Sequence, residues 1–209
     1  MKTRDKKATK KHILDTAREK FAERGYDGAS ISHIAKAAGV NQALIYYYFE
    51  NKQALLNEIL DDFISTANGF LIELARKNYE FGTPEMELQM EKYNRYLLEN
   101  EKTLRLLLTE SLKDSTKVPP IFKLIDFHME GLNEKEVISQ LNKKGFNLDK
   151  EEQQRRVTEF FTGIMPVIIF SLFRKKWCRH FDLPPEELNT LFTRANEMTH
   201  GRHHKKAEH

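Results

Sequence analysis

Apolar residues recur at steps of three and four along the first quarter of the chain, a period that indicates amphipathic helices. The first apolar face predicts a helix from Thr9 to Arg24, and Gly25 is expected to be its C-cap. The basic, polar run before this helix has no apolar stretch behind it, so we do not expect a signal peptide. The face consists of Ile13, Leu14, Ala17 and Phe21.

Two short helices separated by a tight turn are expected next. Ser30 is a suitable N-cap for Ile31–Ala38, and Asn41 is a suitable N-cap for Gln42–Phe49. Gly39 between them is free to adopt a positive φ. The pattern therefore predicts two helices that can cross at close range.

The periodic segments that follow are longer. Asn51 and Thr83 are expected to be N-caps, and Pro166 should kink its helix or be compensated by a neighbour. No segment has the alternating pattern of a strand, so the predicted fold class is all-α. The expected helices cover residues 52–78, 85–100, 102–113, 119–145, 149–180 and 184–199.

The two short helices carry the side chains that a helix-turn-helix requires. Ala35 is small enough to let two helices approach each other, and Gly39 supplies the turn residue. Val40 and Ile45 are expected to fill the core beneath the turn. In this motif the second helix can lie in the major groove of DNA.

Together with its flanks, this segment resembles the TetR family of bacterial regulators, over about the first quarter of the chain. The matching residues are Ile34-Ala35, Ala38-Gly39-Val40, Ile45-Tyr46-x-Tyr48-Phe49, Asn51-Lys52-x-x-Leu55 and, before them, Phe21-x-x-x-Gly25-Tyr26. The departures from the family's common residues are Asn41, Gln42, Ala43 and Ile45. They leave the fold intact but make the DNA sequence unpredictable.

The resemblance implies that the start of the second helix reads DNA, because this end enters the groove in related proteins. Gln42 can form a bidentate hydrogen bond with adenine, and Ala43 can contact a thymine methyl. Asn41 either joins them or serves only as a cap. The resemblance places Tyr46 and Tyr47 against phosphates and base edges; the alternative is packing, since tyrosine is amphipathic.

Lys52 opens the next helix, and its ammonium, with the positive helix terminus, is expected to hold a phosphate. Ser30, Ser32 and His33 are further candidates for backbone contacts, although His33 can equally be merely exposed. Residues 1–52 hold 11 Lys and Arg against 6 Asp and Glu, whereas the remainder holds 23 against 25. This basic segment, including Lys2 to Lys11, is interpreted as a salt-dependent DNA contact; the alternative is a solvated tail.

Beyond residue 55 the expectations come from the resemblance. It implies a helical effector-binding domain whose two last long helices pair with a second copy in a four-helix bundle. We expect residues 1–52 to be the helix-turn-helix domain, residues 53–200 to be this larger domain, and residues 201–209 to be a polar tail.

The predicted dimer interface lies on helices whose apolar residues need burial on more than one side. It consists of Phe160, Ile164, Val167, Ile168, Leu188, Leu191 and Phe192. Other apolar side chains could line a pocket for a small apolar or amphipathic effector, or form ordinary core. These candidates are Phe63, Phe70, Phe122, Phe127, Phe161 and Met165.

The sequence contains few other candidates for a disulfide, a metal site or a membrane span. A lone cysteine, Cys178, excludes an intramolecular disulfide and fits a reducing cytoplasm. His200, His203 and His204 are spaced as metal ligands can be, but they lie in a polar segment, so we expect neither a metal nor another cofactor. The longest apolar run, Phe160 to Phe173, is shorter than the ~20 residues of a membrane helix.

Charged runs are interpreted as solvated helix surfaces. Arg174-Lys175-Lys176 fits a helix end, and the paired carboxylates Asp61-Asp62 and Glu151-Glu152 fit amphipathic faces better than a catalytic site. The sequence contains no glycine-rich phosphate loop and no nucleophile–base pattern, so we do not expect an enzyme.

The sequence therefore favours a cytoplasmic, homodimeric repressor that binds a pseudo-palindromic double-stranded DNA operator and is released by a small-molecule effector. A second hypothesis keeps the fold but replaces the effector by a protein partner. A cavity lined by Phe and Met would favour the first hypothesis, and a filled core the second. An enzyme with an accessory DNA-binding domain would need convergent polar groups in that cavity, and the sequence reveals none.

Overall fold

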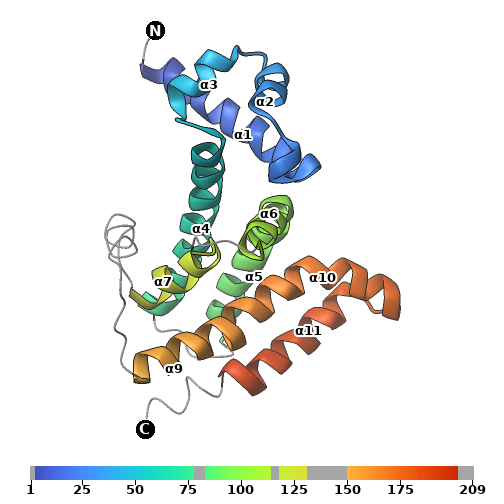
Figure 1. Ribbon diagram of the computed structural model, residues 1–209. Helices are drawn as coiled ribbons and strands as arrows, with labels where there is room; N and C mark the ends of the chain where they lie inside the picture. Colours follow the sequence, from blue (N-terminus) through green and yellow to red (C-terminus); the bar gives the residue numbers. More distant parts are fainter. Residues whose placement is uncertain (1–2, 78–82, 114–117, 131–149, 202–209) are drawn as a thin grey trace. The chain divides into compact units, whose positions relative to one another are not determined.

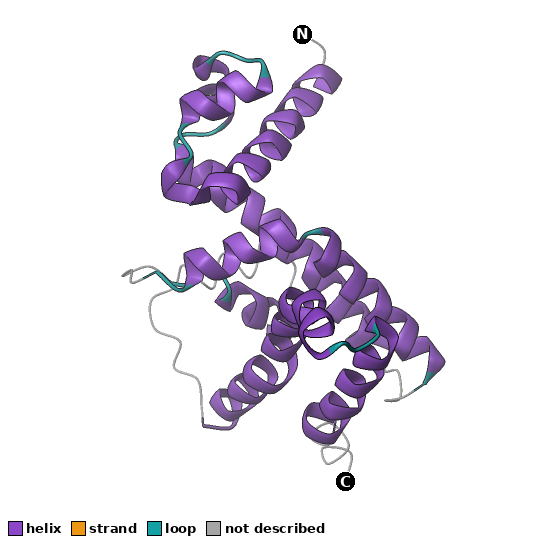
Figure 2. Ribbon diagram, turned by 90° about the vertical axis from the view of Figure 1, so that its right-hand side faces the viewer, coloured by secondary structure: helices purple, strands orange, loops and turns teal. Residues whose placement is uncertain are grey.

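The computed structural model describes residues 3–77, 83–113, 118–130 and 150–201, and the regular elements in these ranges are all helices (Figure 1). Figure 2 shows these helices joined by loops, with no strand in the described ranges. The predicted all-α fold class is confirmed. The first elements are α1 (Thr3–Gly28), α2 (Ile31–Ala38), α3 (Gln42–Tyr48), α4 (Lys52–Lys77), α5 (Pro84–Glu99), α6 (Glu101–Ser111) and α7 (Phe122–Glu130).

The C-terminal elements include two π-helical segments. They are α9 (Lys150–Thr158), the π-helix η1 (Glu159–Ile164), α10 (Met165–Phe181), α11 (Pro185–Asn196) and the π-helix η2 (Glu197–Gly201). The predicted helix end at Gly145 and the predicted helix start at Asp149 lie outside the described residues.

The predicted N-caps are confirmed. Each accepts a hydrogen bond from the backbone N–H three residues further on, over donor–acceptor distances of 2.7 to 3.4 Å. They are Ser30, Asn41, Asn51 and Thr83. These caps explain why α2 to α5 begin within a residue of their predicted starts.

The first helix begins earlier than predicted. The helix begins at Thr3, because its polar residues are compatible with a helix even where no apolar period marks it. Gly25 has non-helical backbone angles, φ 69° and ψ 167°, so the regular helix is broken where its end was predicted, and a further helical turn continues to Gly28. The described part of the basic N-terminal run is therefore helical.

The described residues form two compact units, and the boundary between them falls inside α4. Unit 1 comprises Met1–Ile64 and Lys102–Ile121, and unit 2 comprises Ser65–Glu101 and Phe122–His209. Unit 1 extends beyond the predicted domain 1–52, because the first turns of α4 contribute nearly fully buried side chains. These are Leu55, Leu56, Ile59 and Leu60. The functional division of the chain stays a prediction.

In unit 2, α10 packs against α5, α11 and η1. Phe170 of α10 stacks on Phe192 of α11 with ring centroids 3.9 Å apart and an interplanar angle of 8°. On α5, Tyr93 and Leu97 are almost completely buried. Burial raises the pKa of the Tyr93 phenol well above its ordinary value, so this hydroxyl stays protonated.

Most of the predicted dimer interface lies in the core of the subunit instead of on its surface. An α-helical period alone does not tell which apolar side chains face the same subunit and which face a second copy. The residues buried within the subunit are Phe160, Ile164, Val167, Ile168 and Leu188. Leu191 is half-exposed, and Phe192 is held in the stack with Phe170.

The π-helix η1 explains how the chain accommodates Pro166. Proline has no N–H, and in an α-helix its ring clashes with the carbonyl four residues before it. In η1 the backbone N–H of Met165 donates to the carbonyl of Phe160, five residues back, and Pro166 falls in the first turn of α10. The chain thus accommodates Pro166 by a change of helix type, where the sequence led us to expect a kink or compensation by a neighbour.

Gly163 of η1 faces the imidazole of His200. A Cβ at this position would lie 2.8 Å from Cε1 of His200. The imidazole is held on both sides: its Nδ1 is 3.0 Å from Oγ1 of Thr162, and its Nε2 is 3.5 Å from the buried carboxylate of Glu159. A side chain at 163 would therefore displace a ring that is already fixed by polar contacts.

The helix Lys150–Phe181 spans 32 residues and has a window of mean hydropathy 1.5, of which 33% is buried. By length and composition it could cross a membrane, so the short apolar run within it does not exclude such a span. Core helices of soluble proteins pass the same test. The absence of a membrane partner stays a prediction.

Replacing Gly163 by Ala should lower the free energy of unfolding by about 1–3 kcal/mol, because the added methyl overpacks the site against His200. Chemical denaturation measures this change. Gly69→Ala on α4 is the matched control: nothing lies within 4 Å of its Cβ position, and the gain in helix propensity should stabilise the protein by up to about 1 kcal/mol. Equal stability of the two variants would contradict the packing at Gly163.

Candidate nucleic-acid interface

The turn between α2 and α3 is fixed by backbone conformation at one residue. Gly39 has φ 65° and ψ 28°, in the left-handed region, and its N–H donates to the carbonyl of Lys36. The next N–H, of Val40, donates to the carbonyl of Ala35 over 3.0 Å. These bonds end α2 and let α3 begin within three residues.

Small and branched apolar side chains hold the two helices together. Ala35 and Ile45 are buried as predicted, with Ile45 fully enclosed, whereas Val40 is only half-buried. The Nε2 of His12 on α1 lies 3.1 Å from the carbonyl of Ala38, at the end of α2. The packing of α1, α2 and α3 thus fixes which face of α3 is presented to solvent.

The exposed face of α3 contains the residues that the sequence predicts for reading DNA. Gln42 and Ala43 are exposed, and Tyr46 and Tyr47 have 53% and 64% of their surface accessible. Tyr46 and Tyr47 are therefore not core residues. Asn41 acts as the cap, since its Oδ1 accepts the N–H of Leu44 over 2.7 Å.

Lys6 of α1 supports Tyr47, a contact that sequence reasoning missed. Its Nζ donates to the Tyr47 hydroxyl over 3.2 Å and lies 5.7 Å from the ring centroid. The Tyr47 ring also meets Tyr48 edge to face, with centroids 5.0 Å apart. The N-terminal basic segment therefore restrains one side chain of the candidate reading face.

Lys52 has an internal role that the sequence does not reveal. Its Nζ donates to the carbonyls of Tyr26 and Ala29, over 2.8 and 3.0 Å, and lies 4.2 Å from the Tyr26 ring centroid. Two of its three N–H donors thus satisfy carbonyls at the end of α1. Its predicted phosphate contact stays a prediction and would use the remaining donor.

A second lysine ties α6 to the end of α1 within unit 1. Lys113 Nζ lies 2.8 Å from both Asp27 and Glu110, and 5.2 Å from the Tyr26 ring centroid. The hydrogen bond from Lys113 holds the pKa of the Asp27 carboxyl below its ordinary value. This cluster therefore stays charged on both sides near neutral pH.

The positions available for phosphate contacts lie on α1 and α2. Lys7 and Lys11 on α1 and Lys36 on α2 are exposed. Ser32 and His33 are exposed at the start of α2, whereas the Ser30 hydroxyl is already used as the cap. This surface offers neutral hydrogen bonding from α3 with cationic side chains around it.

Comparison with known proteins identifies the segment. A family model described as "Bacterial regulatory proteins, tetR family" matches residues 13–59. The uncharacterized HTH-type transcriptional regulator YdgC of Bacillus subtilis is 33% identical over 110 residues, which cover 53% of this chain and 52% of that protein. The HTH-type negative transcriptional regulator IcaR of the biofilm operon icaADBC in Staphylococcus epidermidis is 30% identical over 70 residues, or 34% of this chain and 38% of that protein.

The matches thus span about half or less of the length of these curated relatives. A solved tetR-family transcriptional regulator from Streptomyces coelicolor is similar over 95% of this chain and 82% of that chain, with a TM-score of 0.58 and 16% identity. This likeness shows a common fold along almost the whole chain.

Replacing Lys52 by Met should lower the free energy of unfolding by about 1–3 kcal/mol, because two carbonyls lose a charged donor. Thermal or chemical unfolding measures this loss. Lys7→Met should leave stability unchanged and reduce the slope of log affinity for DNA against log salt by about 0.9 if Lys7 contacts a phosphate. Wild-type stability of the Lys52 variant would rule out the internal role.

Replacing Gln42 by Ala should relax base preference at one position of each half-site, with a loss of about 1–3 kcal/mol of discrimination there. Sequencing of DNA fragments selected from a random pool measures this preference. Gln154→Ala on α9, outside unit 1, is the matched control and should select the wild-type sequence. If the Gln42 variant selects the same sequence as the wild type, Gln42 does not read a base.

Proposed function

This chain belongs to the TetR family of DNA-binding transcriptional regulators, and on that premise we propose that it is a homodimeric repressor controlled by a small-molecule effector. The observation that carries the proposal is the exposed face of α3, held in place by a fixed turn and a buried Ile45. In a symmetric dimer, two such faces would enter successive major grooves of a pseudo-palindromic operator. IcaR, a relative, is a negative regulator, which supports repression by this chain.

The proposed DNA contacts fall into two groups, contacts to base edges and contacts to the DNA backbone. Gln42 and Ala43 would read base edges, and Tyr46 and Tyr47 would contact base edges or phosphates. Asn41 would add its amide N–H groups, since its Oδ1 serves as the cap. The proposed contacts to the DNA backbone come from Ser30, Ser32, His33 and Lys52, with the exposed lysines of α1.

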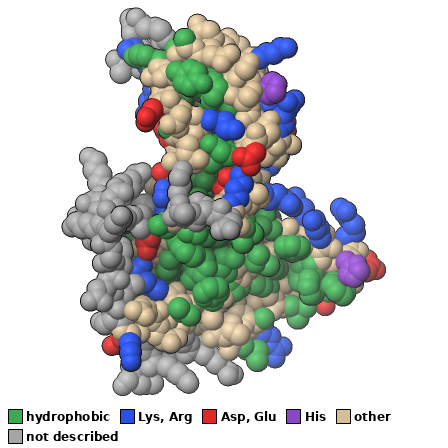
Figure 3. All heavy atoms as spheres, viewed as in Figure 1, with side chains coloured by type: hydrophobic (Ala, Val, Ile, Leu, Met, Phe, Trp, Pro, Cys, Tyr) green, Lys and Arg blue, Asp and Glu red, His purple; other side chains and the backbone are tan. Residues whose placement is uncertain are grey.

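A regular row of exposed apolar side chains along α9, η1 and α10 supports dimerisation. They recur every four residues, with the half-buried Met165 within the row, and each of the others has 43% or more of its surface accessible. Figure 3 shows hydrophobic side chains gathered on this part of the molecule. We name this row the apolar stripe; it consists of Val157, Phe161, Ile169, Phe173, Trp177 and Phe181.

The apolar stripe is the proposed contact with the second copy. Side chains four residues apart form a ridge that packs into the groove of a facing helix. Aromatic residues supply most of the binding energy in such interfaces, and Trp177 is the only tryptophan in the chain. Leu191 on α11 is also exposed and remains in the proposed interface, whereas the residues buried in the subunit do not.

Effector control remains a proposal that the long helix α4 makes physically reasonable. It begins at Lys52, beside α3, and continues into unit 2 without a break in the chain. An effector would shift the protein between two arrangements only by binding one of them more tightly. Unit 2 contains a cavity, but most of its lining residues are polar and Phe170 is the one Phe or Met among them. The space itself, and not the expected Phe and Met lining, supports a sensor over a regulator controlled only by a protein partner.

The residues predicted to line an apolar effector pocket have different surroundings. Phe63 is buried in unit 1, and Phe161 belongs to the apolar stripe. Phe122 is partly exposed and meets Phe160 edge to face, while Phe70 lies against Tyr93 and Tyr96. The side chain of Phe127 lies outside the described residues, and Met165 is half-buried. None of them lines the cavity described below.

Replacing Phe173 by Asp should convert the dimer to monomers and weaken operator binding, because association would bury an unpaired carboxylate at each copy. Sedimentation equilibrium measures the assembly, and a fluorescence-anisotropy titration measures DNA affinity. Leu88→Asp on α5, at a similarly exposed apolar residue outside the stripe, should remain dimeric. A stable dimer of the Phe173 variant would show that the subunits pair elsewhere.

A further inference from the structure

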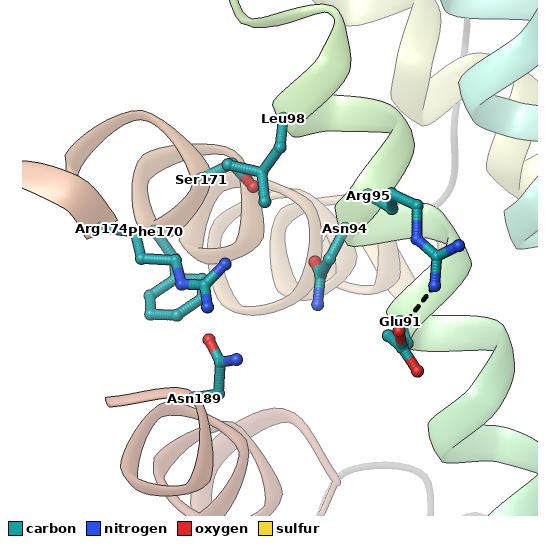
Figure 4. Close-up of a pocket in the computed structure, with 8 residues that line it drawn as sticks. All are labelled: Glu91, Asn94, Arg95, Leu98, Phe170, Ser171, Arg174 and Asn189. Atoms are coloured by element: carbon teal, nitrogen blue, oxygen red, sulfur yellow. Dashed lines mark hydrogen bonds and ion pairs between the residues drawn. The ribbon is translucent and has the colours of Figure 1, made fainter. Parts of the chain in front are cut away.

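A cavity of about 280 Å³ lies in unit 2 among α5, α10 and α11 (Figure 4). Its volume is close to the lower end of the range for small-molecule sites, roughly 300 Å³. The sequence gives no sign of it, because its polar lining comes from three helices that are distant along the chain. Arg174, expected from its basic neighbours to be a solvated helix end, is one of the lining residues.

Three polar side chains point into the same space, one from each helix. They are Asn94 of α5, Arg174 of α10 and Asn189 of α11 (Figure 4). The Nε of Arg174 and the Oδ1 of Asn94 are buried and have no hydrogen-bond partner among the described residues. Buried polar atoms in folded proteins normally have a partner. The Nε of Arg174 is a donor, so it points to a ligand that supplies an acceptor, whereas the Oδ1 of Asn94 is itself an acceptor and is not satisfied by such a ligand.

The net charge of the side chains that line the cavity indicates which charge its ligand should carry. Arg95 is 2.6 Å from Glu91 on the same helix, so these two charges largely offset each other. Arg174 has no such counter-ion among the residues that the structure describes, and it leaves the lining with one net positive charge. A guanidinium binds a carboxylate through two parallel hydrogen bonds, and the amides of Asn94 and Asn189 can donate further ones.

The lining also limits what the site can do. Leu98 and Phe170 add apolar surface beside the polar groups. The Ser171 hydroxyl donates to the carbonyl of Val167 over 2.9 Å, and Glu91 is paired, so neither is arranged as a nucleophile with its base. The polar groups that point into the cavity are therefore suited to binding a ligand and not to a nucleophilic reaction.

We propose that this cavity binds a small carboxylate with an apolar body. The carboxylate lies against Arg174 and the two asparagine amides, and the apolar body lies against Leu98 and Phe170. Because its partners come from α5, α10 and α11, the ligand draws these three helices together. The consequence for DNA binding rests on the proposed function; the binding site itself does not.

Benzoate is the probe, because it combines one carboxylate with a compact apolar ring, and benzamide is its uncharged counterpart of the same shape. Ligand-observed NMR titrations at fixed ionic strength, with full-length protein and no DNA, measure both affinities. We expect saturable benzoate binding at least tenfold tighter than benzamide binding. Arg174→Met, which keeps the aliphatic stem, should weaken benzoate binding at least tenfold.

Two further variants test whether a loss of benzoate binding is specific to the cavity. Asn189→Leu should weaken benzoate severalfold through the loss of a separate donor on another helix. Arg179→Met, at an exposed residue of α10 outside the cavity, is the matched control and should bind as the wild type does. Thermal unfolding without ligand identifies any variant that fails to fold.

Three results would overturn the proposal: no saturable benzoate binding to the wild type, equal affinity for benzoate and benzamide, or unchanged affinity in folded Arg174→Met. Since these titrations contain no DNA, they do not depend on whether the chain reads an operator. A separate operator titration with and without benzoate tests the regulatory link. Loss of that link alone would count against effector control and leave the site intact.

Discussion

The anchoring of α3 by Ile45 is the interaction on which the proposed DNA reading by this chain depends. The helix has seven residues, too few to be stable in water by itself, and Ile45 is its only residue that is fully buried among those described. The cap at Asn41 and the left-handed Gly39 fix where the helix begins. A few hydrogen bonds at the turn and one apolar contact therefore fix the positions of the exposed Gln42, Tyr46 and Tyr47.

The residues behind α3 extend this restraint into the rest of unit 1. Lys52 connects the start of α4 to carbonyls at the end of α1, and Lys113 connects α6 to the same region through Asp27. Both lysines are basic residues of unit 1, yet both form internal contacts. Positive charge in this unit thus serves the fold, in addition to the proposed phosphate contacts.

Sequence reasoning succeeded where the structure is local. Caps, glycine turns and apolar periods depend on neighbours within a few residues, so α2, α3 and the starts of α4 and α5 could be predicted. It failed where the outcome depends on distant parts of the chain. Ile168 and Phe173 are both apolar residues of α10, yet one is fully buried and the other is half-exposed on the apolar stripe. Arg174 shows the same limit, because only the approach of α5 and α11 makes it part of a cavity.

In the proposed dimer, two copies of α3 related by a two-fold axis read one DNA site. Hydroxyl-radical footprinting of a selected DNA fragment tests it most directly. We expect two equivalent protected half-sites whose centres lie about one helical turn, roughly 34–36 Å, or a multiple of it apart. A single protected half-site, or protection without two-fold symmetry, would contradict it.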